Sequence, residues 1–64
     1  MTIRFIKNTG LSNQTNIEII NLTESDTVPH IGSDIIMNHI KYFVEDIIIN
    51  YDCPQHVDVV VTKI

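Results

Sequence analysis

The residues best suited to metal binding or nucleophilic chemistry in this 64-residue sequence are one cysteine and three histidines. Cys53 and His56 stand in a C-x-x-H spacing, and His30 and His39 could supply further ligands. Zinc needs about four converging groups, and structural zinc sites are usually built from paired short spacings. Only one short spacing is present. We therefore expect no bound metal and interpret Cys53 as a turn residue beside a histidine that begins a strand.

The remaining reactive side chains do not form a recognisable catalytic set. Nothing in the sequence around Cys53 supplies the orienting third group or the oxyanion loop of nucleophilic catalysis. Glu45 and Asp46 are adjacent, so on a helix their side chains would diverge rather than share a proton. Gly10 and Gly32 stand alone and form no phosphate-binding loop. We therefore expect a protein that is not an enzyme and that carries no cofactor.

The elements that must position these residues are predicted from hydrophobic periodicity. Residues 2–7 and about 15–23 alternate apolar and polar side chains and predict two strands of a hairpin. Ser33 is a suitable helix N-cap, and residues 34–51 after it predict one amphipathic helix. Residues 56–64 are rich in valine and predict a last strand.

Together these elements predict a single α+β domain over residues 1–64 with the topology ββαβ. A right-handed crossover from the second strand places the last strand on the far side of the first, antiparallel to it. The sheet is then three-stranded and antiparallel in the order 2-1-3. The amphipathic helix covers one face of that sheet.

Two apolar surfaces stay uncovered in this predicted arrangement. On the back of the helix, Ile35, Tyr42 and Ile49 recur every seven residues between polar neighbours. The open sheet face would carry several aliphatic residues beside three charged ones: Ile6, Ile20, Leu22, Val60 and Ile64, with Arg4, Glu18 and Asp58. Isolated exposed apolar residues are ordinary, whereas patches of this size are typical of interaction surfaces. We predict that the interface consists of Ile35, Tyr42, Ile49, Ile20, Leu22 and Val60.

The length of the chain indicates how this apolar surface is used. A domain of this size buries only ~60% of the surface that its unfolded chain exposes, and small domains usually gain stability from disulfides, a metal or a partner subunit. One cysteine permits no intrachain disulfide. Because two-fold dimers are the commonest closed assembly, we predict a homodimer.

Charge and composition exclude several classes of partner. The net charge is −4, with four basic residues against eight acidic ones, which does not suit nucleic acid or an anionic membrane. No signal peptide and no membrane-spanning apolar run are visible, and a single thiol suits a reducing cytosol, so we expect a cytoplasmic protein. Thirteen isoleucines and no alanine or tryptophan are typical of AT-rich genes, which are common in phages.

These observations predict a small acidic binding protein that covers the surface of a protein partner. A phage-encoded inhibitor of a host enzyme or defence system is the specific form of this hypothesis, and a mimic of nucleic acid is a narrower variant. Two alternatives stay open. One is a ligand-binding or enzymatic homo-oligomer with a pocket at the subunit interface, and the other is a structural subunit of a larger assembly.

Overall fold

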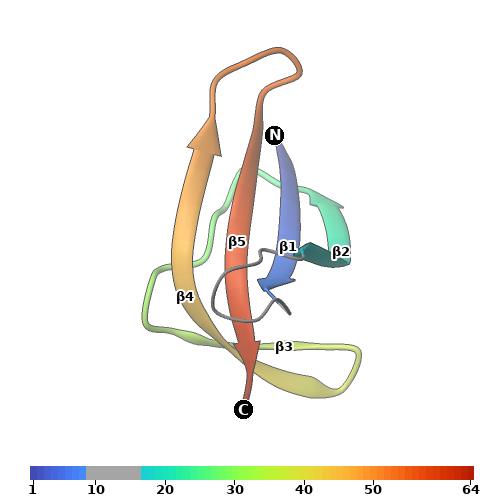
Figure 1. The fold of residues 1–64 in the computed structure, drawn as a ribbon, viewed down its shortest axis with the longest axis vertical. Coiled ribbons are helices and arrows are strands. Elements are labelled where there is room, and N and C mark those ends of the chain that lie inside the picture. The colour runs from blue at the N-terminus through green and yellow to red at the C-terminus, as the bar shows by residue number, and fades with distance from the viewer. Residues whose placement is uncertain (9–16) are drawn as a thin grey trace.

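The described part of the chain is built from β-strands alone. A computed structural model describes residues 1–8 and 17–64, and no helix occurs among them (Figure 1). The strands are β1 (Thr2–Asn8), β2 (Ile17–Glu24), β3 (Asp34–Met37), β4 (Ile40–Asn50) and β5 (His56–Lys63). The predicted α+β class with a helix on a three-stranded sheet is therefore wrong. None of the described residues belongs to a helix that could cross a bilayer.

All five strands belong to one mixed sheet in the order β2-β1-β5-β4-β3. Neighbouring strands are antiparallel except for β1 and β5, which are parallel. The last strand thus lies beside the first, but with the direction opposite to the predicted one. The β3–β4 hairpin bends across the C-terminal end of β5, so the sheet curls into an open half-barrel (Figure 1).

The segment predicted as a helix is a β-hairpin. Asn38 and His39 both have positive φ, 52° and 65°, and they connect Met37 to its cross-strand partner Ile40. Two positive φ values in a two-residue loop define a type I′ turn, whose twist matches that of antiparallel strands. On both sides of this turn the sequence is rich in isoleucine, valine and aromatic residues, which lose side-chain freedom in a helix and favour strands.

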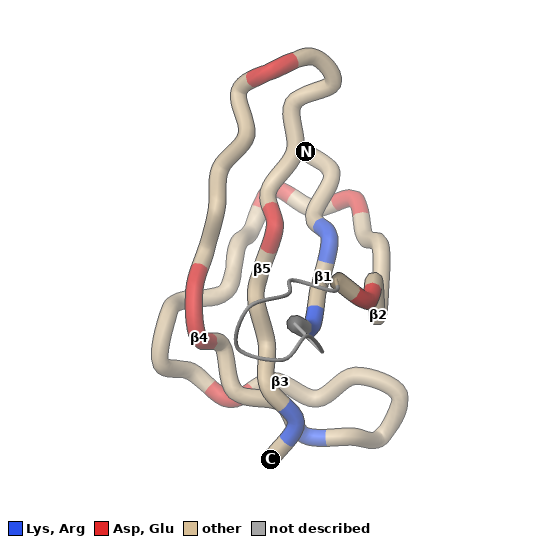
Figure 2. The backbone as a smooth tube through the Cα atoms, in the orientation of Figure 1, with Lys and Arg blue, Asp and Glu red and all other residues tan. Residues whose placement is uncertain are grey.

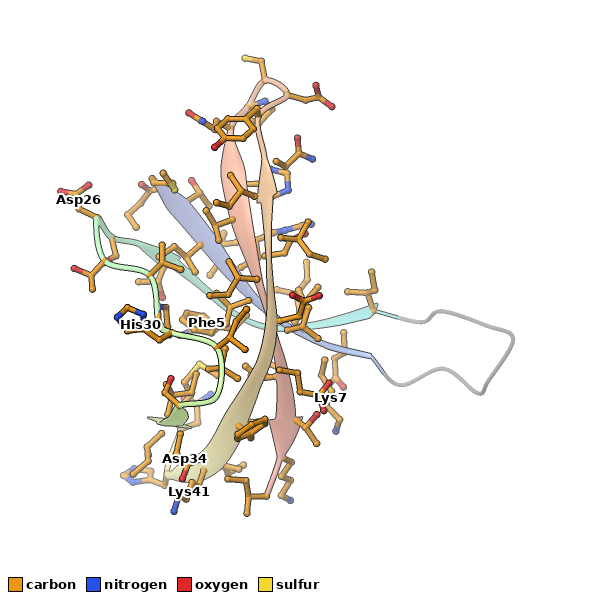
Figure 3. All side chains as sticks on the ribbon, turned by 90° about the vertical axis from the view of Figure 1, so that its left-hand side faces the viewer. Phe5, Lys7, Asp26, His30, Asp34 and Lys41 are labelled. Carbon is orange, nitrogen blue, oxygen red and sulfur yellow. The ribbon has the colours of Figure 1, made fainter. Side chains whose placement is uncertain are left out.

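The core lies on the inner, concave face of the curled sheet. Its buried members come from β1, β4 and β5 and are Ile3, Phe5, Tyr42, Val44, Val57, Val59 and Val61. Residues 25–33, which connect β2 to β3, run along this face in place of the predicted helix, and Val28 packs against the core. Figure 3 shows this connection, which carries His30, on the side of the sheet toward which Phe5 points.

Two register shifts decide which side chains reach the core. In β2 the partner of Phe5 is Asn21, whereas the partner of Ile6 is Ile19, so Ile20 is an extra residue. Ile20 packs against the core from this irregularity. In β4 a similar shift lies between Val44 and Asp46. Such bulges bend a strand and change its alternation, which a strict period of two does not anticipate.

Candidate binding surface

The face of the sheet opposite the core, which we call the outer face, is organised in rows across four strands. Cross-strand partners point to the same face, so the register gives each row directly. One row consists of Ile19 of β2, Ile6 of β1, Val60 of β5 and Asp46 of β4. The next row consists of Leu22, Arg4, Asp58 and Ile48 on the same four strands. A third row is entirely polar: Glu24, Thr2, His56 and Asn50.

An ion pair between the parallel strands occupies the middle of the second row. Arg4 Nε donates to Asp58 Oδ1 at 2.7 Å and Arg4 Nη2 donates to Asp58 Oδ2 at 2.9 Å. This two-pronged geometry is the strong form of the contact between guanidinium and carboxylate. The Asp58 side chain is 13% exposed and that of Arg4 33% exposed. The pair therefore joins β1 to β5 in a partly dehydrated environment.

The hydrogen bond from Arg4 is the main reason that the pKa of Asp58 lies below its ordinary value of 3.8. Burial acts in the opposite direction, and the charges of Arg4 and His56 lower this pKa further. The same hydrogen bond raises the pKa of Arg4. Asp58 therefore stays ionised through the physiological range, and the pair is a permanent feature of the outer face.

His56 extends the pair toward the polar row. Its Nε2 lies 3.7 Å from Asp58 Oδ1, and its Nδ1 lies 3.1 Å from the carbonyl oxygen of Pro54. The Pro54 oxygen can only accept, so this contact is a hydrogen bond in the tautomer that carries its proton on Nδ1. An aspartate beside a histidine also occurs in catalytic triads, where the histidine activates a hydroxyl or thiol. Among the residues that the structure describes, no hydroxyl or thiol is hydrogen-bonded to His56.

Large aliphatic side chains surround the ion pair. Leu22 is 61% exposed, Ile19 53% and Ile48 49%, while Val60 between them is partly buried. We call these four residues the outer patch. Ile6 is buried beneath it and does not belong to the inner core cluster. Acidic side chains lie at the margin: Glu24, which accepts from the Thr2 hydroxyl, and Glu45, which accepts from the Thr62 hydroxyl.

The six predicted interface residues separate into three groups. Leu22 and Val60 lie on the outer face, in adjacent rows. Tyr42 is buried in the inner core, and its cross-strand partner Ile35 packs against the same core, as does Ile20. Ile49 is 51% exposed at the far end of β4. The seam of Ile35, Tyr42 and Ile49 was predicted on a helix that does not exist. In the sheet all three lie on the inner face, where Ile35 and Tyr42 pack in the core and Ile49 stays half exposed.

The candidate metal ligands and acids lie on different parts of the sheet. Cys53 is exposed in the loop between β4 and β5, His39 lies in the β3–β4 turn, and His30 lies in the connection from β2 to β3. Within residues 1–8 and 17–64 no three potential ligands form a group that could hold a metal ion. The surface of the same residues has no detected pocket. Gly10, considered for a phosphate loop, lies outside the described residues.

One further surface was missed by the sequence analysis. Residues 46–50 of β4 pair with β5 on one side, and no described strand pairs with their other edge. The run Ile47-Ile48-Ile49 between Asp46 and Asn50 was assigned to the helix. Read as a strand, the same run indicates an apolar edge.

No protein-family model, curated protein or solved structure matches this chain. Its function is therefore inferred from the geometry of its surfaces.

Proposed function

We propose that this chain is a small acidic binding protein without enzymatic activity, which acts by covering part of a protein partner with its outer patch. The outer patch itself carries the proposal: Ile19, Leu22 and Ile48 are each about half exposed or more on one face of the sheet. Burial of apolar surface stabilises association by ~25 cal/mol per Å² before the costs of association are subtracted. Patches of this kind mark interaction sites on small soluble domains.

The ion pair suits the centre of such an interface. A charge that becomes buried without a partner destabilises a complex strongly. Arg4 and Asp58 already satisfy each other through two hydrogen bonds. A partner can therefore cover the middle of the patch without supplying a counter-charge, while the pair holds β1 and β5 in a fixed relative position.

The charges at the margin indicate the chemistry of the partner. Glu24, Glu45 and Asp46 lie around the outer patch, and the chain as a whole has a net charge of −4. A complementary partner presents an apolar centre with a basic rim, which would favour fast association at low salt. Acidic residues elsewhere are scattered over several strands and loops (Figure 2). This scatter favours recognition of a protein surface over imitation of nucleic acid.

The specific form of the proposal is an inhibitor, encoded by a phage, that blocks a host enzyme or defence protein in the cytoplasm. Its support is the isoleucine-rich composition without alanine or tryptophan, together with the small size of the chain. A protein of this kind needs no catalytic residues, because it acts by occupying a surface that its target uses.

The test compares two variants that add the same charge at different places. Leu22→Asp alters the outer patch, and Ile36→Asp alters β3, where the side chain is 73% exposed. Both should fold, since both side chains are largely in solvent. In pull-downs from a bacterial lysate, the wild type and Ile36→Asp should retain the same stoichiometric protein and Leu22→Asp should lose it. Equal retention by all three would contradict the proposal.

A further inference from the structure

The far half of β4 presents an open edge of the sheet. β4 is eleven residues long, but β3 pairs only with Ile40–Phe43. The backbone of Val44 then bonds to Gly32 and Ser33, at 2.9 Å each. Beyond the bulge, residues 46–50 pair with β5, and no described backbone group bonds to their outer edge. Figure 3 views the molecule from the side of β4, and in its upper half no ribbon crosses in front of this strand.

An edge of this composition is a template for another strand. Alternate backbone N–H and C=O groups along it lack a partner in the sheet, and natural proteins usually protect such edges with charge, proline or short length. The only protection seen on residues 46–50 is local: Asp46 Oδ1 accepts from the Ile47 N–H at 2.8 Å. Ile48 and Ile49, which follow, are 49% and 51% exposed.

The sequence of this edge is complementary to itself. We infer that a second copy of this chain pairs with it, antiparallel, about a two-fold axis at Ile48. Ile48 then lies opposite Ile48 of the second copy, Ile47 opposite Ile49, and Asp46 opposite Asn50. Every apolar side chain faces an apolar one on its own face of the sheet, and each carboxylate faces an amide that can donate to it.

Other registers on β4 and the edge strand β2 match less well. Moving the axis to Ile47 would set Asp46 opposite Ile48, and moving it to Ile49 would set Asp46 opposite Asp52. Like charges opposite each other destabilise a strand pair. On β2 an axis at Ile20 sets Glu18 opposite Leu22. The remaining edge strand, β3, has only four residues and offers a shorter contact, so the edge of β4 at Ile48 is the favoured two-fold contact.

Pairing at this edge would join two five-stranded sheets into one sheet of twice the width. A two-fold axis at right angles to the sheet keeps both outer faces on the same side. The outer patches, which the proposed function uses, would stay open in the dimer except at Ile48. Ile48 lies in both contacts, whereas Ile19 and Leu22 lie in the outer patch alone, so Leu22→Asp can abolish partner binding while the dimer persists.

The first experiment places like charges on the axis. Ile48→Asp and Ile48→Lys each set two equal charges against each other, and each should raise the dimer dissociation constant at least about 30-fold in sedimentation equilibrium. An equimolar mixture of the two variants should restore a 1:1 dimer, because the charges are then opposite. Ile36→Asp makes the same isoleucine-to-aspartate replacement away from the proposed axis. This variant should dimerise as the wild type does.

The second experiment reads the register. In Ile48→Cys with Cys53→Ser, the two thiols meet at the axis, where opposed Cα atoms lie ~4.5–5.5 Å apart, a distance that a disulfide can span. Mild oxidation should give a covalent dimer, and Ile36→Cys with Cys53→Ser should not. A wild type that stays monomeric at millimolar concentration would overturn the inference. So would an Ile48→Asp variant that dimerises as tightly as the wild type. If Leu22→Asp loses partner capture while it still dimerises, the dimer inference is supported independently of the proposed function.

Discussion

The ion pair between Arg4 and Asp58 should contribute measurably to folding, and a double-mutant cycle can isolate its contribution. Arg4→Met keeps the packing of the aliphatic stem, and Asp58→Asn keeps the shape of the carboxylate. Hydrogen bonds to charged groups are worth ~1.5–3 kcal/mol, and exposed ion pairs ~0.2–1 kcal/mol. Because Arg4 is one-third exposed and Asp58 nearly buried, we expect a coupling free energy of about 1–2 kcal/mol at neutral pH.

An exposed ion pair on the same sheet provides the matched control. Lys41 Nζ lies 3.4 Å from Asp34 Oδ2, and these side chains are 56% and 48% exposed. The corresponding cycle of Lys41→Met and Asp34→Asn should give a coupling below about 0.5 kcal/mol. Urea unfolding followed by circular dichroism measures all free energies. A domain of this size shifts its melting temperature by ~4–8 °C per kcal/mol, so thermal scans give an independent reading.

The pH dependence separates a charge interaction from a packing effect. The pKa of Asp58 is lower in the folded protein than its ordinary value of 3.8. A group of this kind contributes its full stabilisation above the unfolded pKa, and the stabilisation is lost as the pH falls through the folded pKa. The coupling should therefore be constant between pH 5 and 7 and should shrink below about pH 4. A coupling below 0.5 kcal/mol at pH 7, or one that persists unchanged at pH 2, would refute this account.

Three further substitutions test the fold. Tyr42→Glu places a charge in the inner core, where Tyr42 is 7% exposed, and should cost at least about 3 kcal/mol, enough to unfold much of the protein at 25 °C by circular dichroism. His39→Gly should raise the stability by about 0.5–1 kcal/mol in urea titrations, because glycine adopts the positive φ of a type I′ turn without strain. Gly32→Ala should lower stability by about 1–2 kcal/mol through its φ of 89° alone, since an added Cβ meets no atom within 4 Å. The assigned conformation would be contradicted if Tyr42→Glu stayed folded, or if His39→Gly or Gly32→Ala left the free energy of unfolding unchanged.

The strands with plain alternation could be predicted from the sequence. Residues 2–7 and 56–64 carry an apolar core residue at every second position, Ile3 and Phe5 in one and Val57, Val59 and Val61 in the other, and they correspond to β1 and β5. The same alternation placed Arg4 and Asp58 on the face opposite the core, but their pairing depends on the parallel register of β1 and β5, which were predicted to be antiparallel. In such segments one period dominates, so local sequence determines both the element and its faces.

The hairpin of β3 and β4 could not be predicted, because its signals are ambiguous. Its turn contains His39 where glycine is the usual marker of a two-residue loop. Within β4 the bulge between Val44 and Asp46 changes the alternation, so the apolar residues of the whole segment no longer follow a period of two. The resulting spacing resembles a helical stripe, and Ser33 resembles an N-cap. Strand propensity over seven β-branched residues was the better guide.

The assignment of residues 34–51 to a helix also led to the wrong location for part of the predicted interface. A helix on one face would leave Ile35 and Tyr42 exposed, whereas the hairpin turns them toward the core. The prediction of Leu22 as an interface residue depended only on the N-terminal hairpin, and the structure places it on the outer face. The predictions of a homodimer and of a protein partner remain predictions. The open edge of β4 depends on how far β3 extends along β4. Contacts between the strands determine that length, and local sequence does not.

The central position of β5 has a consequence for how the chain reaches its native state. Up to Gln55 the chain can form two hairpins, β1–β2 and β3–β4, that are not neighbours in the sheet. β5 connects them within the sheet, as it inserts between β1 and β4. The pairing of β1 with β5 brings together residues more than 50 positions apart, such as Ile3 and Val57 of the inner core. Contacts this distant in sequence slow folding, and until β5 arrives the inner edges of both hairpins are exposed to other chains.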